Sequence, residues 1–189
     1  LTDVHVEANP DVNQPLVSQV GAGLAIYGNQ GYRLQGTEVV STGHIAFLSG
    51  PFAGQFASQS ISEIRDSNVR FTSTTGDVED TALQFQGTFG TVNVVNTTFE
   101  VDGSVTLYAR NGLQTYHIAN SNFVIGNDAI AATKVPRLGF VIDGAGALFD
   151  YTNNTATFHN AGQFEVVVEP GNQLLRSQIR VADSTFTGS

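Results

Sequence analysis

The sequence predicts an all-β fold, a right-handed parallel β-helix of about six coils. Three observations predict it: a six-residue motif that recurs along the chain, short strand-like triplets between its copies, and a low content of charged residues. Hydrophobic residues make up 41% of the 189 residues and charged residues only 13%, with 20 glycines. Soluble domains carry about 25% charged residues, and β-branched and aromatic side chains fit a pleated sheet. The composition therefore favours one β-rich domain with a substantial core.

The recurring motif is an apolar residue, any residue, Asn or Asp, two small polar residues and a second apolar residue. Clear copies occupy residues 64–69, 94–99, 118–123 and 181–186, and weaker copies lie at 34–39 and around 153–155. The third position falls at residues 36, 66, 96, 120, 153 and 183, which are 30, 30, 24, 33 and 30 residues apart. A near-regular step of this size indicates one supersecondary unit that repeats along the chain.

Between these copies lie short triplets with apolar residues two positions apart, the spacing of a strand with one buried face. They occupy residues 24–26, 45–47, 83–85, 105–107, 138–140 and 164–166. Glycine-rich turns follow most of them. Each repeat is therefore expected to contain a strand, a turn, a second strand, an Asn/Asp corner and a loop of variable length.

Two arrangements of these strands stay open: coils of a parallel β-helix, and two antiparallel sheets in a sandwich or jelly roll. The parallel β-helix is favoured for two reasons. The residues of the motif themselves repeat, and the repeats differ in length in their loops while the motif stays in place. Asn and Asp suit a tight corner, since both tolerate the left-handed conformation and bond the local backbone. We expect a buried structural ladder formed by Asp66, Asn96, Asn120, Asn153 and Asp183.

The two ends of the chain differ from its middle. Residues 1–20 contain Pro10 and Pro15 and no copy of the motif. They are expected to form an end cap or an arm that pairs with a neighbouring subunit, while residues 21–189 form a single β-repeat domain. The sequence reaches Ser189 just after a copy of the motif, which predicts an uncapped last coil. We therefore expect self-association through the N-terminal arm and the uncapped C-terminal coil.

Charge and composition limit the partners and the location. The net charge is −9 and Lys134 is the single lysine, which disfavours nucleic acid and anionic membranes because both attract clustered basic residues. No apolar run reaches the roughly 20 residues of a membrane helix. Cysteine, methionine and tryptophan are absent, so few side chains can be oxidised, and the missing initiator methionine suggests processing. We expect an extracellular or cell-surface protein whose signal peptide has been removed.

No catalytic site is expected, because the residue patterns that carry chemistry do not converge. Glycoside hydrolysis needs two carboxyl groups about 5–10 Å apart, whereas Asp66 and Asp183 are the only acids of the expected ladder and would lie four coils apart. The alternative is a sparse cleft that acts on polysaccharide, formed on adjacent coils by Arg110, Arg137 and Asp143.

Local patterns predict two further kinds of site. Asp77, Glu79 and Asp80 form the densest acidic cluster, and Ca²⁺ prefers carboxylate ligands. No EF-hand spacing accompanies them, so a solvated loop is the alternative, and no cofactor other than Ca²⁺ is expected. Asn96 and Asn153 each begin an Asn-x-Thr triplet, which makes both candidate glycosylation acceptors.

The copies Asn-Thr-Thr-Phe at 96–99 and Asn-Ser-Asn-Phe at 120–123, with the alternating strands, resemble the right-handed β-helix proteins of the pectate-lyase-like superfold. The resemblance covers about residues 24–186. It implies a place among polysaccharide lyases and hydrolases, phage tailspikes or bacterial surface adhesins. The chain lacks the clustered aspartates of the pectin-cleaving enzymes, so the resemblance points to the non-enzymatic surface members.

The function expected from the sequence is that of an extracellular structural protein rather than an enzyme. It would be a self-assembling filament subunit or an adhesin-like surface module, with glycans as candidate partners. A polysaccharide-acting lyase or hydrolase and a trimeric phage or virus fibre segment are the alternatives. The fold alone does not decide among them.

Overall fold

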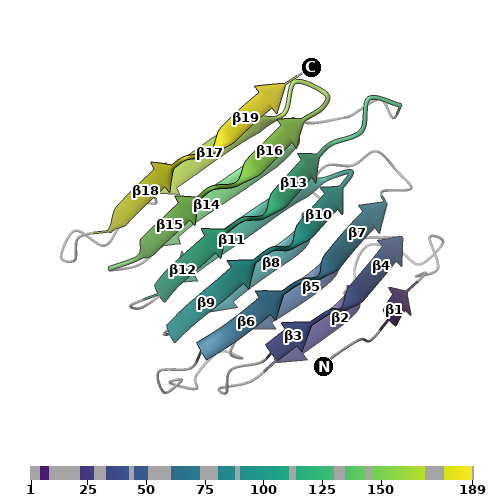
Figure 1. Cartoon of the computed structure of the whole chain (residues 1–189), viewed down its shortest axis with the longest axis horizontal. Coiled ribbons are helices and arrows are strands. Elements are labelled where there is room, and N and C mark those ends of the chain that lie inside the picture. The colour runs from purple at the N-terminus through teal and green to yellow at the C-terminus, as the bar shows by residue number, and fades with distance from the viewer. Residues whose placement is uncertain are drawn as a thin grey trace.

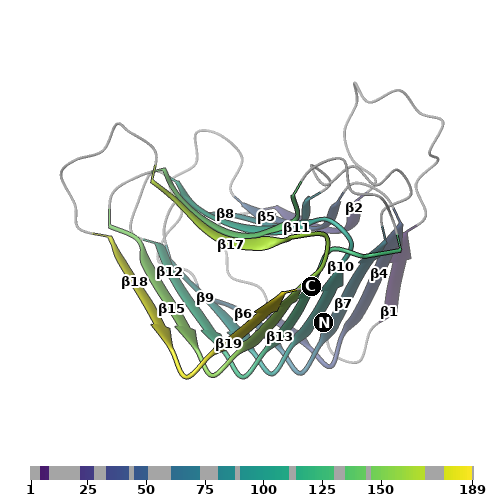
Figure 2. The same ribbon diagram turned by 90° about the horizontal axis from the view of Figure 1, so that it is seen from above.

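The computed structural model of the chain is a stack of parallel β-strands (Figure 1). The strands form three sheets that enclose one core, as Figure 2 shows in the view turned by 90°. The structure describes residues 5–8, 22–27, 33–42, 45–50, 61–72, 81–87, 90–110, 114–129, 135–143, 146–168 and 177–188. Among these residues, no helix is long and apolar enough to cross a membrane.

We name the sheets by their order within one repeat, starting with the sheet that precedes the Asn/Asp corner. Sheet I contains β3 (Arg33–Gln35), β6 (Ile61–Arg65), β9 (Gly90–Val95), β12 (Gln114–Ala119), β15 (Leu148–Thr152) and β18 (Gln178–Ala182). Sheet II contains β1 (His5–Ala8), β4 (Glu38–Thr42), β7 (Asn68–Thr72), β10 (Thr98–Val101), β13 (Asn122–Ile125), β16 (Thr155–Phe158) and β19 (Thr185–Gly188). Sheet III contains β2 (Ala22–Tyr27), β5 (Ile45–Gly50), β8 (Thr81–Gly87), β11 (Ser104–Arg110), β14 (Arg137–Asp143) and β17 (Gln163–Val168).

The order of strands within each sheet identifies the architecture. Hydrogen-bonded neighbours are always three strands apart in the sequence, as in β9, β12 and β15 of sheet I. The pairings between described strands are parallel throughout. The chain therefore winds through sheets I, II and III in turn, which confirms the predicted parallel β-helix. The antiparallel sandwich is wrong for this chain.

The described strands in the middle of the stack, such as β6, β9, β12 and β15, bury every second side chain. In β12 the alternation runs through the whole strand, from buried Gln114 to partly exposed Ala119. The parallel register places like-facing residues of successive turns directly opposite one another, so that Phe99 pairs with Val69 on one side and Phe123 on the other. A shift of the register by one residue would turn the buried apolar side chains of a strand outward. The motif prevents that shift because it fixes the start of every strand of sheet II from β4 to β19.

The core consists of these stacked columns. The rings of Phe99 and Phe123 lie 4.8 Å apart at an interplanar angle of 14°, and those of Tyr116 and Phe149 lie 5.0 Å apart at 8°. Such stacking follows from the spacing of neighbouring strands, about 4.8 Å, and adds roughly 0.5–1.5 kcal/mol per pair to the burial of apolar surface.

Part of the predicted N-terminal arm belongs to the stack. Strand β1 pairs with β4, with His5 opposite Glu38 and Ala8 opposite Ser41. It forms one edge of sheet II, and β19 forms the other. The remaining residues of segment 1–20 lie outside the described part of the chain.

Candidate functional site

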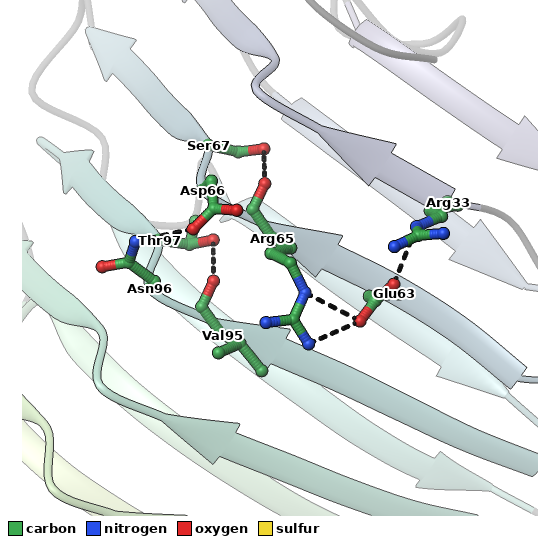
Figure 3. A network of polar contacts seen from close by, with 8 residues as sticks. All are labelled: Arg33, Glu63, Arg65, Asp66, Ser67, Val95, Asn96 and Thr97. Atoms are coloured by element: carbon green, nitrogen blue, oxygen red, sulfur yellow. Dashed lines mark hydrogen bonds and ion pairs between the residues drawn. The ribbon is translucent and has the colours of Figure 1, made fainter.

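The Asn/Asp corner joins sheet I to sheet II in every described repeat from β6 to β19. Its third-position residues all adopt the left-handed conformation, with φ between 50° and 56°. Two side-chain contacts link successive turns: Asn96 Nδ2 donates to Asp66 Oδ1 at 2.6 Å (Figure 3), and Asn153 Nδ2 donates to Asn120 Oδ1 at 2.6 Å. The side chains of Asp66, Asn96, Asn120, Asn153 and Asp183 are exposed.

Their exposure corrects the expectation of a buried ladder. The left-handed residue turns its side chain outward, and the residue that follows it turns inward. Buried or half-buried polar side chains occupy this next position, namely Thr37, Ser67, Thr97, Ser121, Asn154 and Ser184.

This inner ladder links the turns through hydrogen bonds. Ser121 Oγ donates to the carbonyl of Ala119 at 3.0 Å and accepts from the backbone N–H of Thr97, one turn earlier, at 3.2 Å. The amide of Asn154 continues the ladder, because its Oδ1 accepts from the N–H of Ser121 at 2.8 Å and its Nδ2 donates to the carbonyl of Ile118 at 2.8 Å. This set was not predicted from the sequence, although the small polar residue after each Asn or Asp was the available signal.

The corner is therefore a structural device. The backbone N–H groups of Asp66, Asn96, Asn120 and Asn153 each donate to the following turn, as from Asn96 to the carbonyl of Ala119 at 3.1 Å. Its two acids do not cooperate, since the positions of Asn96, Asn120 and Asn153 lie between Asp66 and Asp183 in the stack. The exposed amides of Asn96 and Asn153 are the two glycosylation candidates, and both lie at this corner.

The other predicted residues do not gather into one site. Arg110 on β11 pairs in register with Asp143 on β14. Arg137 begins β14 six positions before Asp143, about 20 Å away along the strand, and forms an ion pair with Glu165 (Nη1–Oε2 2.9 Å). The structure therefore brings Arg110 and Asp143 into register and leaves Arg137 at the other end of β14. The calcium candidates Asp77, Glu79 and Asp80 lie outside the described residues, within which no three His, Asp or Glu side chains form a metal-binding group.

The outer face of sheet II instead carries a groove of about 430 Å³ at the carboxyl ends of β7, β10 and β13. Backbone hydrogen bonds hold the residues after these strands in register, with Asp102 N–H donating to the carbonyl of Phe71 and Gly126 N–H to that of Val101. Gly126 has a φ of +83°, and a Cβ there would approach the carbonyl oxygen of His159 to 2.8 Å. The close passage of these chains at the groove therefore requires glycine.

Paired polar side chains line the groove. Arg70 Nε contacts Glu100 Oε2 at 2.8 Å, and this carboxylate raises the pKa of the Arg70 guanidinium. Asn127 Nδ2 donates to Asp102 Oδ1 at 3.1 Å. These pairs bridge neighbouring turns, and both partners of the Arg70–Glu100 pair are nearly half exposed.

A second group closes one end of the groove. His159 Nδ1 lies 2.7 Å from Asp128 Oδ2, and the other oxygen of Asp128 accepts from the N–H of Asn160 at 2.8 Å. Asn160 Nδ2 in turn donates to the carbonyl of Asn127 at 2.6 Å. The groove is thus lined by paired polar groups, with one arginine against the carboxylates of Glu100, Asp102 and Asp128.

This groove was not predicted from the sequence because its residues come from four repeats. Asp102-Gly103 and Asn127-Asp128 have the composition of ordinary turns, and His159 has no metal-binding spacing. Their shared position, directly after successive strands of sheet II, was the available signal.

The last turn of the stack shows a third feature, an open apolar edge. Val181 is 42% exposed although it lies opposite the fully buried Tyr151, and Phe186 is 38% exposed opposite Ala156. On β17, Val168 is 68% exposed opposite the buried Ile142. These side chains continue the columns of the core, but no described strand covers them.

No protein-family model, no curated protein and no solved structure matches this chain significantly. The resemblance to the pectate-lyase-like superfold is supported only at the level of the parallel β-helix.

Proposed function

We propose that this chain is a structural module of an extracellular surface assembly, a filament subunit that associates through its open apolar edge. The observation that carries the proposal is the exposure of Val181, Phe186 and Val168 in columns that are buried elsewhere. The composition supports an extracellular setting, because the chain contains no Cys, Met or Trp.

Two properties of this edge favour association with another chain: backbone groups without a described strand partner, and exposed apolar side chains. The outer edges of β17, β18 and β19 have no described neighbour, so their backbone groups are available for pairing with another chain. The apolar side chains beside them gain roughly 25 cal/mol for each Å² that a partner buries.

Sedimentation velocity of residues 1–189 over a wide concentration range tests the proposal, with two lysine substitutions as a matched pair. Val168 and Ile61 are equally exposed, at 68% and 69%, but Val168 lies on the open edge and Ile61 lies inside the stack on β6. We expect wild type and Ile61→Lys to associate and Val168→Lys to stay monomeric, since an edge lysine opposes strand pairing. A wild-type chain that is monomeric throughout, or equal effects of the two substitutions, would contradict the proposal.

The groove on sheet II favours a second candidate function, an adhesin-like module that binds a neutral glycan. Its volume lies within the usual range of ligand pockets, and its paired donors and acceptors match hydroxyl groups. A panel of neutral and acidic glycans tests it, with Arg70→Ala in the groove and Arg33→Ala on sheet I as its control. Binding that is lost in both variants alike, or is confined to acidic glycans, would count against this candidate. A polysaccharide-acting lyase or hydrolase and a fibre segment remain alternatives, and product formation with the same panel would favour the enzyme.

A further inference from the structure

The groove on sheet II is longer in one direction than in the other, and this shape limits the ligands that fit it. We propose that it binds a linear, neutral oligosaccharide laid lengthwise across the strands, from Arg70 at one end to the His159–Asp128 pair at the other. The inference rests on the proposed glycan-binding function of the groove and adds the shape of the ligand and its placement.

The dimensions of the groove give the first argument. Its lining residues lie on, or directly after, four neighbouring strands of sheet II, namely β7, β10, β13 and β16 (Figure 1). The groove therefore extends about 14 Å across the strands, since neighbouring strands are about 4.8 Å apart. Along β7 and β10 the lining covers only residues 70–72 and 100–102, a length of about 7 Å. An elongated ligand therefore fits best with its long axis along the stack.

Polar groups that repeat along the same direction give the second argument. The backbone N–H groups of Asp102, Gly126 and His159 each donate to a carbonyl near the end of the strand one turn earlier. Side chains continue this row, with Asn127 Nδ2 donating to Asp102 Oδ1 at 3.1 Å and Asn160 Nδ2 to the carbonyl of Asn127 at 2.6 Å. A ligand along the stack therefore meets similar polar groups at each turn, about 4.8 Å apart.

The chemistry of the lining gives the third argument. Val124 lies opposite Glu100 in register and lines the groove, so an apolar contact is available between polar edges, as the C–H face of a sugar ring requires. Arg70 pairs with Glu100 at 2.8 Å, and His159 with Asp128 at 2.7 Å. A hydroxyl group both donates and accepts, so it bonds to either member of such a pair. An anionic ligand would instead face the carboxylates that line the groove.

A series of oligosaccharides of increasing length tests the placement. Neutral linear oligomers of glucose, N-acetylglucosamine and mannose, from one to six units, are titrated into the full chain by isothermal titration calorimetry. We expect the affinity to rise about two- to tenfold with each unit that adds a hydrogen bond, and to stay constant once the ligand spans the groove. A site that held a single sugar would gain only in proportion to the number of equivalent units.

Substitutions at the two ends locate the ligand. Arg70→Ala changes the β7 end and His159→Gln the β16 end, while Arg33→Ala on sheet I is the control. Both side chains at the ends are partly exposed, so the fold should persist, and circular dichroism checks this for each variant.

The distance between the ends gives a quantitative expectation. Effects of substitutions more than about 7–10 Å apart are independent, and these two side chains lie three strands apart. We expect each end variant to weaken the longest ligand about two- to tenfold, and the double variant to weaken it by the product of the two factors. The shortest ligand that binds should respond to one end variant alone, or to neither.

The outcomes separate the inference from the proposed function. Length-dependent binding that both end variants weaken supports the lengthwise placement. A single sugar that binds as tightly as the longest ligand, or a longest ligand that only one end variant weakens, overturns the placement and leaves the glycan-binding proposal standing. A chain that binds none of the oligosaccharides overturns both.

Discussion

Asn154 offers the sharpest test of the inner ladder. The Asn154→Ala substitution removes an acceptor from the buried N–H of Ser121 and a donor from the carbonyl of Ile118, both at 2.8 Å. Asn154 is only 2% exposed, so water cannot replace these bonds without opening the corner. Leaving a buried polar group unpaired costs about 1–3 kcal/mol, and the two losses together predict a decrease of about 2–4 kcal/mol in the free energy of unfolding.

The matched control is Asn154→Ser. Ser67, Ser121 and Ser184 occupy the same position in other turns, and each donates to the carbonyl two residues earlier. Serine at 154 is expected to form that bond and to accept from the N–H of Ser121, so its cost should stay below about 1 kcal/mol.

Thermal unfolding followed by far-ultraviolet circular dichroism measures both variants. For a domain of this size, 1 kcal/mol corresponds to about 2–4 °C in Tm, so we expect Asn154→Ala to lower Tm by about 5–15 °C and Asn154→Ser by a few degrees. Equal losses in the two variants, or no loss in Asn154→Ala, would refute the view that the inner ladder holds the corner through hydrogen bonds.

Two other predictions concern a tyrosine and the left-handed corner. Burial raises the pKa of Tyr151, so the neutral phenol is favoured in the folded chain. The unfolded chain therefore loses this proton first as the pH rises. The free energy of unfolding keeps its full value below about pH 10 and falls by up to about 1.4 kcal/mol per pH unit above it. Urea unfolding measures the loss of free energy of unfolding between pH 8 and pH 11. This loss should be smaller for Tyr151→Phe than for wild type, and equal losses would contradict the prediction. At the corner, both Asn120→Ala and Asn120→Gly lose the bond to Asn153, but only alanine is strained at φ 54°. The Asn120→Ala variant should therefore be less stable than the Asn120→Gly variant by about 1–2 kcal/mol. The reverse order of stability would show that backbone strain does not matter at this corner.

Much of the fold could be predicted from the sequence. The spacing of the motif predicts a stack of similar turns, and the alternation of apolar residues predicts which face of each strand is buried. Both are local properties: a strand exposes alternate side chains to its two faces, and a tight corner selects Asn, Asp or Gly. The positions of Asp66, Asn96, Asn120, Asn153 and Asp183 at equivalent corners follow from this reasoning.

The direction of the corner side chains could not be predicted. Asn96 and Thr97 are adjacent polar residues, and composition gives no reason for the first to face solvent and the second to face the core. The left-handed backbone at Asn96 decides it, because this conformation turns successive side chains to opposite sides of the corner.

Contacts between turns were decided by the tertiary structure alone. Asp102, Asn127 and Asn160 are 25 and 33 residues apart in the sequence yet share one chain of hydrogen bonds, because winding brings such residues to the distance between neighbouring strands. Conversely, Arg137 and Asp143 are close in the sequence but lie at opposite ends of β14. The sequence by itself determined the repeat and its corners, whereas the groove and the inner ladder depend on the register between turns, which no local pattern contains.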